Sequence, residues 1–124
     1  MTFSQSLAQS GEKESRAKQF KKEVKACLSQ GSPKQCKAEY ERFLTFLEAS
    51  SQDALYFEEL IRKSHLVDQL APNKIEALVL KKLATFPEGA LKNTIMSNGY
   101  LKLTILYYYA QEFDQTERTA LIAL

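Results

Sequence analysis

Residues 17–46 read AKQFKKEVKACLSQGSPKQCKAEYERFLTF, and this stretch predicts a helical hairpin. Apolar side chains recur at helical spacing on both sides of a break at Gly31-Ser32-Pro33, which combines a helix-ending glycine with a helix-starting proline. Ser32 to Gln35 also has the spacing of a capping box. We expect helices over residues 11–30 and 33–49, and because the loop is short they must run antiparallel.

The rest of the chain continues this helical pattern. Residues 53–70 carry a wide apolar band that Pro72 ends or interrupts, and residues 75–86 repeat at helical spacing up to Pro87. Beyond Pro87 we expect a short helix capped at Asn98-Gly99, a helix over residues 100–113, and a last one that begins with a capping box at Asp114. The fold class is therefore all-α, a small bundle of five to six helices.

A β-hairpin at Asn98-Gly99 is the alternative for residues 94–109. Asn-Gly between apolar runs is a strong hairpin signal, and residues 101–109 alternate partly with period two. We favour the helix because Leu106 and Tyr108 would occupy the polar face of such a strand, and because no partner strands are predicted.

The length of 124 residues predicts one domain, which we place at residues 11–124. Residues 1–10 are polar, uncharged and without periodicity, so we expect a loose N-terminal arm there. They contain no apolar core of a secretory signal, and no apolar run is long enough for a transmembrane helix. We therefore expect a soluble protein that is intracellular rather than secreted.

Cys27 and Cys36 would meet at the bend of the predicted hairpin. Facing ends of a tight helical hairpin can lie within the Cα separation of about 4.4 to 6.8 Å that a disulfide requires. The default expectation is nevertheless two reduced core cysteines, because free cysteine is among the most buried residue types and disulfides are rare in reducing cytosol. A metal site is not predicted, since two thiols need further ligands and the single histidine, His65, has no adjacent cysteine.

The C-x8-C spacing around a turn resembles the inner cysteine pair of CHCH-type helical hairpins of the mitochondrial intermembrane space. The resemblance covers residues 17–46. The outer cysteine pair of that family would fall at Ala17 and Phe46, so the sequence carries half of the motif and assigns no family.

Positive charge is concentrated near the N-terminus. The chain has a net charge of +2, whereas residues 11–37 hold 8 basic and 3 acidic side chains, a net charge of +5. A basic face formed by Lys18, Lys21, Lys22 and Lys25 could attract nucleic acid. The simpler interpretation is the solvated side of an amphipathic helix.

Residues for catalysis are scarce. Only four glycines are present and none are clustered, so no nucleotide-binding loop can be drawn, and His65 with Asp68 three positions later is typical of a helix surface pair. We predict no enzyme, no catalytic residue, no metal and no cofactor.

The C-terminal third is rich in tyrosine and ends in apolar residues. Three consecutive tyrosines on a helix cover about 200° of its circumference, so at least one must reach the surface. Exposed tyrosines and an apolar end are common in interfaces. We therefore predict a non-catalytic interaction module, a small subunit, adaptor or assembly factor that docks another protein or a second copy of itself, with nucleic-acid binding through residues 11–37 as the alternative. The predicted interface residues are Tyr107, Tyr108, Tyr109, Leu121, Ile122 and Leu124.

Overall fold

The computed structural model describes the backbone of residues 3–124 and the side chains from Gly11 onward. Over these residues the regular structure is helical, without strands, which confirms the all-α class. The chain divides into two compact units, Met1–Gln52 and Asp53–Leu124, which are described separately. The single domain predicted for residues 11–124 stays a prediction.

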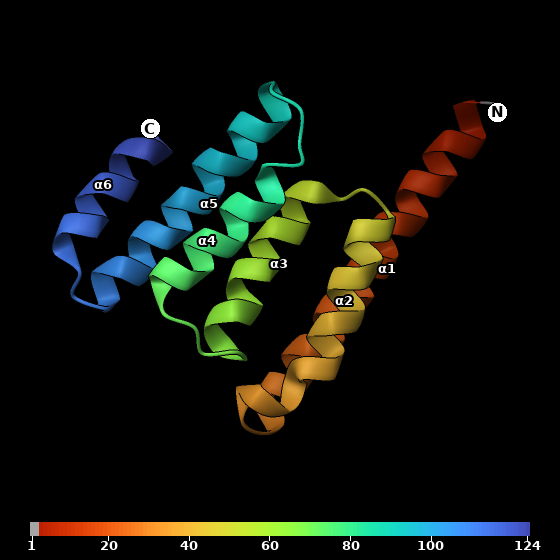
Figure 1. The fold of residues 1–124 in the computed structure, drawn as a ribbon. Coiled ribbons are helices and arrows are strands. Elements are labelled where there is room, and N and C mark those ends of the chain that lie inside the picture. The colour runs from red at the N-terminus through yellow and green to blue at the C-terminus, as the bar shows by residue number, and fades with distance from the viewer. Residues whose placement is uncertain (1–2) are drawn as a thin grey trace. The chain divides into compact units, whose positions relative to one another are not determined.

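The first unit is the predicted helical hairpin (Figure 1). Helix α1 (Phe3–Gln30) packs against α2 (Lys37–Ala49), and a short 3-10 helix, η1 (Pro33–Cys36), follows the bend. Phe20 of α1 stacks on Phe43 and Phe46 of α2, with ring centroids 6.0 and 5.1 Å apart. The Ser32 side chain makes no capping bond, and instead the Gln35 amide donates to the Ser32 carbonyl at 3.0 Å.

Helix α1 begins earlier than the sequence indicated, at Phe3 rather than near Gly11. The arm predicted over residues 1–10 falls on residues whose side chains, and for residues 1 and 2 also the backbone, lie outside the described part of the chain.

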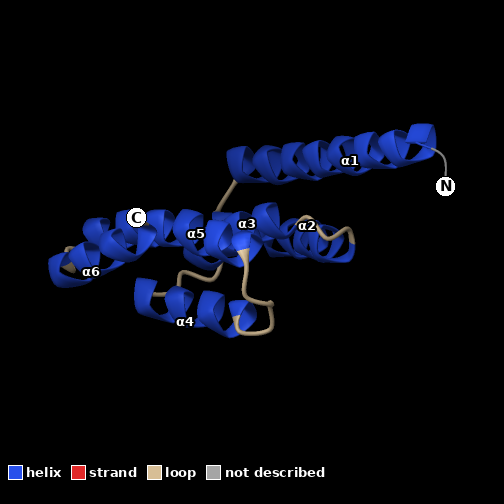
Figure 2. Ribbon diagram, turned by 90° about the horizontal axis from the view of Figure 1, so that it is seen from above, coloured by secondary structure: helices blue, strands red, loops and turns tan. Residues whose placement is uncertain are grey.

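The second unit contains α3 (Asp53–Leu66), α4 (Pro72–Leu83), α5 (Ala90–Tyr109) and α6 (Phe113–Ala123). Helices α3, α5 and α6 form one layer, and α4 packs against one face of it (Figure 2). Pro72 starts α4, where its missing amide proton costs nothing. Gln69 and Gln111 take left-handed backbone conformations with φ of 53° and 61°, which turn the chain out of α3 and α5.

The structure of residues 90–109 differs from the sequence prediction in three ways, because they form one helix, α5. It runs unbroken through Asn98-Gly99, so the β-hairpin alternative, the cap at this dipeptide and the break between two helices are wrong. The reason is tertiary packing, because α5 buries Ile95, Tyr100 and Leu103 at helical spacing toward its neighbours.

Helix α6 also differs from its prediction. It begins at Phe113 with Glu112 as the N-cap residue, and no side-chain capping bond forms, so the predicted capping box at Asp114 is wrong. The Thr116 hydroxyl donates to the Glu112 carbonyl at 3.0 Å instead.

Candidate functional site

Helix α5 is apolar on two opposite sides. Its inner side is buried and includes Tyr100, Leu103 and Tyr107, two of which bind α4. On the other side Leu101, Ile105 and Tyr108, spaced i, i+4 and i+7, are 57%, 49% and 57% exposed. We call these three residues the outer stripe. Because the inner side faces α4, the outer stripe lies on the face of the layer that no helix of residues 53–124 covers.

An aromatic corner extends the outer stripe to the end of α5. The Tyr108 ring meets the rings of Tyr109 and Phe113 edge to face, with centroids 5.8 and 6.0 Å apart. All three side chains are more than half exposed, and Tyr109 is 77% exposed. Edge-to-face packing holds the rings in a fixed arrangement while their outer surfaces stay accessible. Glu112 and Asp114, both exposed, place negative charge beside the rings.

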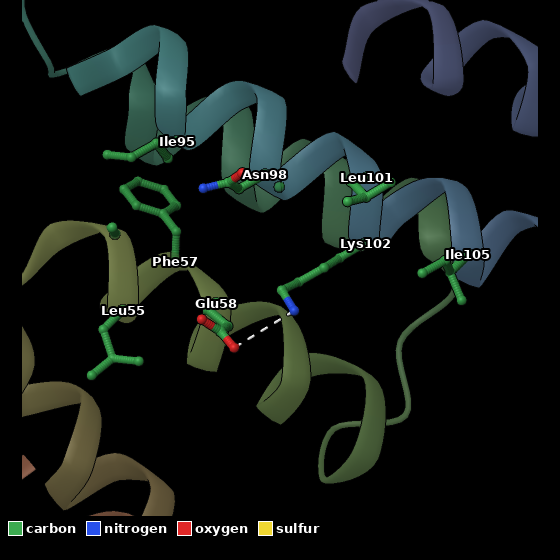
Figure 3. A pocket seen from close by; sticks show the side chains of 10 residues that line it. Leu55, Phe57, Glu58, Ile95, Asn98, Leu101, Lys102 and Ile105 are labelled. Atoms are coloured by element: carbon green, nitrogen blue, oxygen red, sulfur yellow. Dashed lines mark ion pairs between the residues drawn. The ribbon is translucent and has the colours of Figure 1, made fainter. Parts of the chain in front are cut away.

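A groove runs between α3 and α5 beside the outer stripe (Figure 3). Its larger part has a volume of about 500 Å³, and a second depression of about 260 Å³ continues toward the end of α3. Glu58 and Lys102 form an ion pair of 3.6 Å and line both depressions. Half-exposed ion pairs contribute at most about 1 kcal/mol, so this pair can open at little cost. The apolar lining residues are Ala54, Leu55, Phe57, Ile61, Leu66, Ile95, Leu101, Ile105 and Leu106.

A polar cluster is buried on the opposite, α4 side of α5. The two oxygens of Glu76 accept four hydrogen bonds: Tyr107 and Arg118 Nη2 donate to Oε1, both at 2.6 Å, and Tyr100 and Arg118 Nη1 donate to Oε2 at 2.7 and 3.0 Å. Burial alone would raise the pKa of Glu76, but these bonds outweigh it and hold the pKa below its ordinary value. Burial and the bond to Glu76 raise the pKa of Tyr100 to about 12, and the same causes raise the pKa of Tyr107.

This cluster links α4, α5 and α6 through hydrogen bonds, and its carboxylate has few lone pairs left to bind or act on a substrate. Each carboxylate oxygen already accepts two strong bonds, so Glu76 would have to lose one to act on a substrate. Glu76 is a charged side chain on the buried side of α4, which the sequence analysis did not predict. One signal could have found it: on a helical wheel Glu76 falls between Leu80 and Leu83, at the edge of the apolar arc.

The predicted interface residues divide into two groups. Tyr107 is 1% exposed and bonded to Glu76, so its placement in the interface is wrong. The others reach the surface: Tyr108, Tyr109, Leu121, Ile122 and Leu124.

The predicted basic face lies on α1. Lys18, Lys22 and Lys25 are exposed, whereas Lys21 is half-buried. His65 is exposed at the second depression, and Asp68 pairs with Lys63 at 2.9 Å rather than with this histidine.

Cys27 and Cys36 form a disulfide at the bend of the first unit. Their Cα atoms are 5.9 Å apart, inside the range expected for the hairpin. The expectation of two reduced thiols is wrong, because the bend aligns the last turn of α1 with η1. Cys36 is fully buried, Cys27 is half-buried, and Oε2 of Glu39 lies 3.8 Å from the Cys27 sulfur.

Comparison with known proteins adds no assignment: no family model matches the chain, and neither a curated protein nor a solved structure matches it significantly. No helix in the described part of the chain combines the length and hydrophobicity that crossing a bilayer needs.

Proposed function

We propose that the protein is a non-catalytic interaction module that docks another protein through the outer face of its second unit. The observation that carries this proposal is the exposure of the outer stripe on a helix whose other side is already buried. A surface helix usually has one apolar side, which it buries, and a polar side toward water, whereas α5 has apolar side chains on two opposite sides. Exposing one side of such a helix to water is unfavourable, and a partner that covers it recovers about 25 cal/mol per Å² of apolar surface.

The aromatic corner and the groove add the features of a recognition surface. Tyrosine and phenylalanine provide rigid contact area, and a groove beside an apolar stripe suits an amphipathic helix of the partner. Glu112 and Asp114 beside the rings favour a partner with basic side chains, because lysine and arginine bind carboxylates and aromatic faces together.

A matched pair of variants tests this function. Ile105 and Leu80 belong to the same unit and are 49% and 42% exposed, but only Ile105 belongs to the outer stripe. We expect Ile105→Asp to weaken docking at least tenfold and Leu80→Asp to leave it unchanged. The measurement is native mass spectrometry and sedimentation of the tagged full chain purified from its own source.

A photocrosslinking residue in place of Tyr109 should capture the same partner, or a second copy of the chain, whereas one in place of Leu78 should not. A monomer at high concentration that crosslinks to nothing from position 109 would contradict the proposal.

Nucleic-acid binding remains the second candidate, supported by Lys18, Lys22 and Lys25. These lysines are exposed. Three phosphate contacts predict that the logarithm of affinity falls with the logarithm of salt concentration with a slope of about −3. Replacing all three by glutamate should abolish this binding, and a flat salt response of the unchanged protein would exclude it.

The disulfide gives information about the compartment in which the protein is found. Stable disulfides are rare in reducing compartments, so the Cys27–Cys36 bond supports exposure to oxidising conditions and weighs against the predicted intracellular, fully reduced setting. Thiol alkylation of the protein taken directly from its source would measure the oxidised fraction.

A further inference from the structure

We propose that, when the Cys27–Cys36 disulfide is reduced, the two thiolates and the Glu39 carboxylate bind a zinc ion at the bend of the first hairpin. This site is separate from the docking face and does not depend on the proposed function.

Three consecutive structural elements bring the donor atoms together. Cys27 lies in the last turn of α1, Cys36 ends η1, and Glu39 lies in the first turn of α2. Their sulfur and oxygen ligand atoms all lie within 4.8 Å of one another. The sequence alone does not predict Glu39 as a ligand, because only the folded bend brings its carboxylate close to the two sulfurs.

The distance between the Cys27 sulfur and the Glu39 carboxylate agrees with tetrahedral zinc, whereas the two sulfurs are bonded to each other and must separate once the disulfide is reduced. With Zn–S bonds of about 2.3 Å and Zn–O bonds of about 2.0 Å, neighbouring ligand atoms lie about 3.8 Å apart for two sulfurs and about 3.5 Å apart for sulfur and oxygen. The distance from the Cys27 sulfur to Oε2 of Glu39 is 3.8 Å. Arg42 approaches the other oxygen, Oε1, at 3.8 Å, so Oε2 remains directed at the sulfur.

The donor set selects the kind of metal. Thiolates are soft ligands that favour zinc and related transition metals over calcium or magnesium. Cys27 and Glu39 are half-buried, whereas Cys36 is fully buried, so water can supply the fourth ligand from the Cys27 and Glu39 side.

Reduction and metal binding are two successive steps. A dithiol reductant gives two electrons and two protons to the disulfide, becomes a disulfide itself, and leaves two thiols on the protein. Zinc then replaces the two thiol protons, which pass to solvent, and forms two Zn–S bonds. The same bend is thus closed either by the disulfide or by the metal. In the reverse step an oxidised dithiol takes two electrons from the two thiolates and two protons from solvent, the Cys27–Cys36 bond forms again, and the zinc ion leaves.

Cobalt is the probe for this site. We expect the reduced full chain to bind one Co²⁺ with a thiolate-to-cobalt charge-transfer band, and Zn²⁺ to displace it. The oxidised protein should show no band. Cys36→Ser should abolish the band, and Glu39→Gln should weaken Co²⁺ binding at least tenfold.

Glu41→Gln is the matched control, because Glu41 is an exposed carboxylate of the same helix that pairs with Lys37 at 3.9 Å. This variant should bind Co²⁺ as the unchanged protein does. Far-ultraviolet circular dichroism confirms that each variant keeps its helices. Absence of stoichiometric binding by the reduced protein, or equal binding by Glu39→Gln and Glu41→Gln, would overturn the proposal.

Discussion

The two compact units are held in shape by different chemistry. The first unit closes its bend with a covalent bond between Cys27 and Cys36. The second joins α4, α5 and α6 through one nearly buried carboxylate, Glu76, which Tyr100, Tyr107 and Arg118 surround. A covalent link constrains the unfolded chain and responds to redox conditions. An ion pair with one nearly buried partner acts in the folded state and responds to the loss of either partner.

The largest effect should come from removing the cation of the polar cluster. Arg118→Leu leaves the Glu76 carboxylate nearly buried with two neutral donors. Because the Arg118 side chain is itself 44% exposed and solvent screens it, we expect a loss of about 3 kcal/mol in the free energy of unfolding, the lower limit for fully buried pairs. Hydrogen exchange of peptides from residues 53–124 measures it. Glu88→Gln is the control, because Glu88 forms an exposed i,i+4 pair with Lys92, and it should change stability by less than about 1 kcal/mol. Equal losses of stability in the two variants would show that the Glu76 cluster stabilises the unit no more than an exposed ion pair does.

Breaking the covalent link should have a slightly smaller effect. For a closed loop of this length, loop-closure entropy gives about 2.5 kcal/mol, so Cys27→Ser with Cys36→Ser should destabilise the first unit by about that amount. Exchange of amides in residues 11–49 provides the measurement. The double variant also makes the stability of this unit insensitive to reductant, and a remaining response to reductant would contradict the assignment.

Acid should weaken the polar cluster by a smaller amount than either substitution. The pKa of Glu76 is lowered on folding, so its contribution is complete above the ordinary carboxyl pKa of 4.5 and is lost as the pH falls through the folded value. Urea unfolding of the unchanged protein compared with Glu76→Gln, at a series of pH values from neutral downward, isolates this contribution. The difference in stability between the two proteins should shrink as the pH falls, and a constant difference would argue against the lowered pKa.

The smallest effect should be a gain in stability. Gly99 lies inside α5, and a Cβ atom there would meet Ile61 Cδ1 at 3.7 Å, an ordinary contact distance. Glycine inside a helix costs about 0.5 to 1 kcal/mol relative to alanine, so Gly99→Ala should stabilise the second unit by about that amount. A loss of stability in urea unfolding would show that α3 and α5 need the glycine for their approach.

The sequence predicted where helices form better than it predicted which of their side chains are buried and which are exposed. Helical spacing and the Gly31 to Pro33 break identified the first hairpin, because those signals are local. The sequence prediction at Asn98-Gly99 was wrong because this dipeptide favours a turn only locally, and burial of apolar side chains along α5 stabilises the helix more. Tyr107 was misplaced in the interface because only the folded unit shows that its hydroxyl donates to Glu76 in the interior.

The two sulfurs of the disulfide are unequally accessible, and this sets an order of events during thiol exchange. An incoming thiolate can reach half-buried Cys27 but not fully buried Cys36, so it bonds to Cys27 and expels Cys36 as the leaving thiol. The Glu39 carboxylate stands 3.8 Å from the attacked sulfur and repels anions. An uncharged phosphine should therefore open this bond faster, relative to an anionic thiol, than it opens a disulfide in a simple peptide.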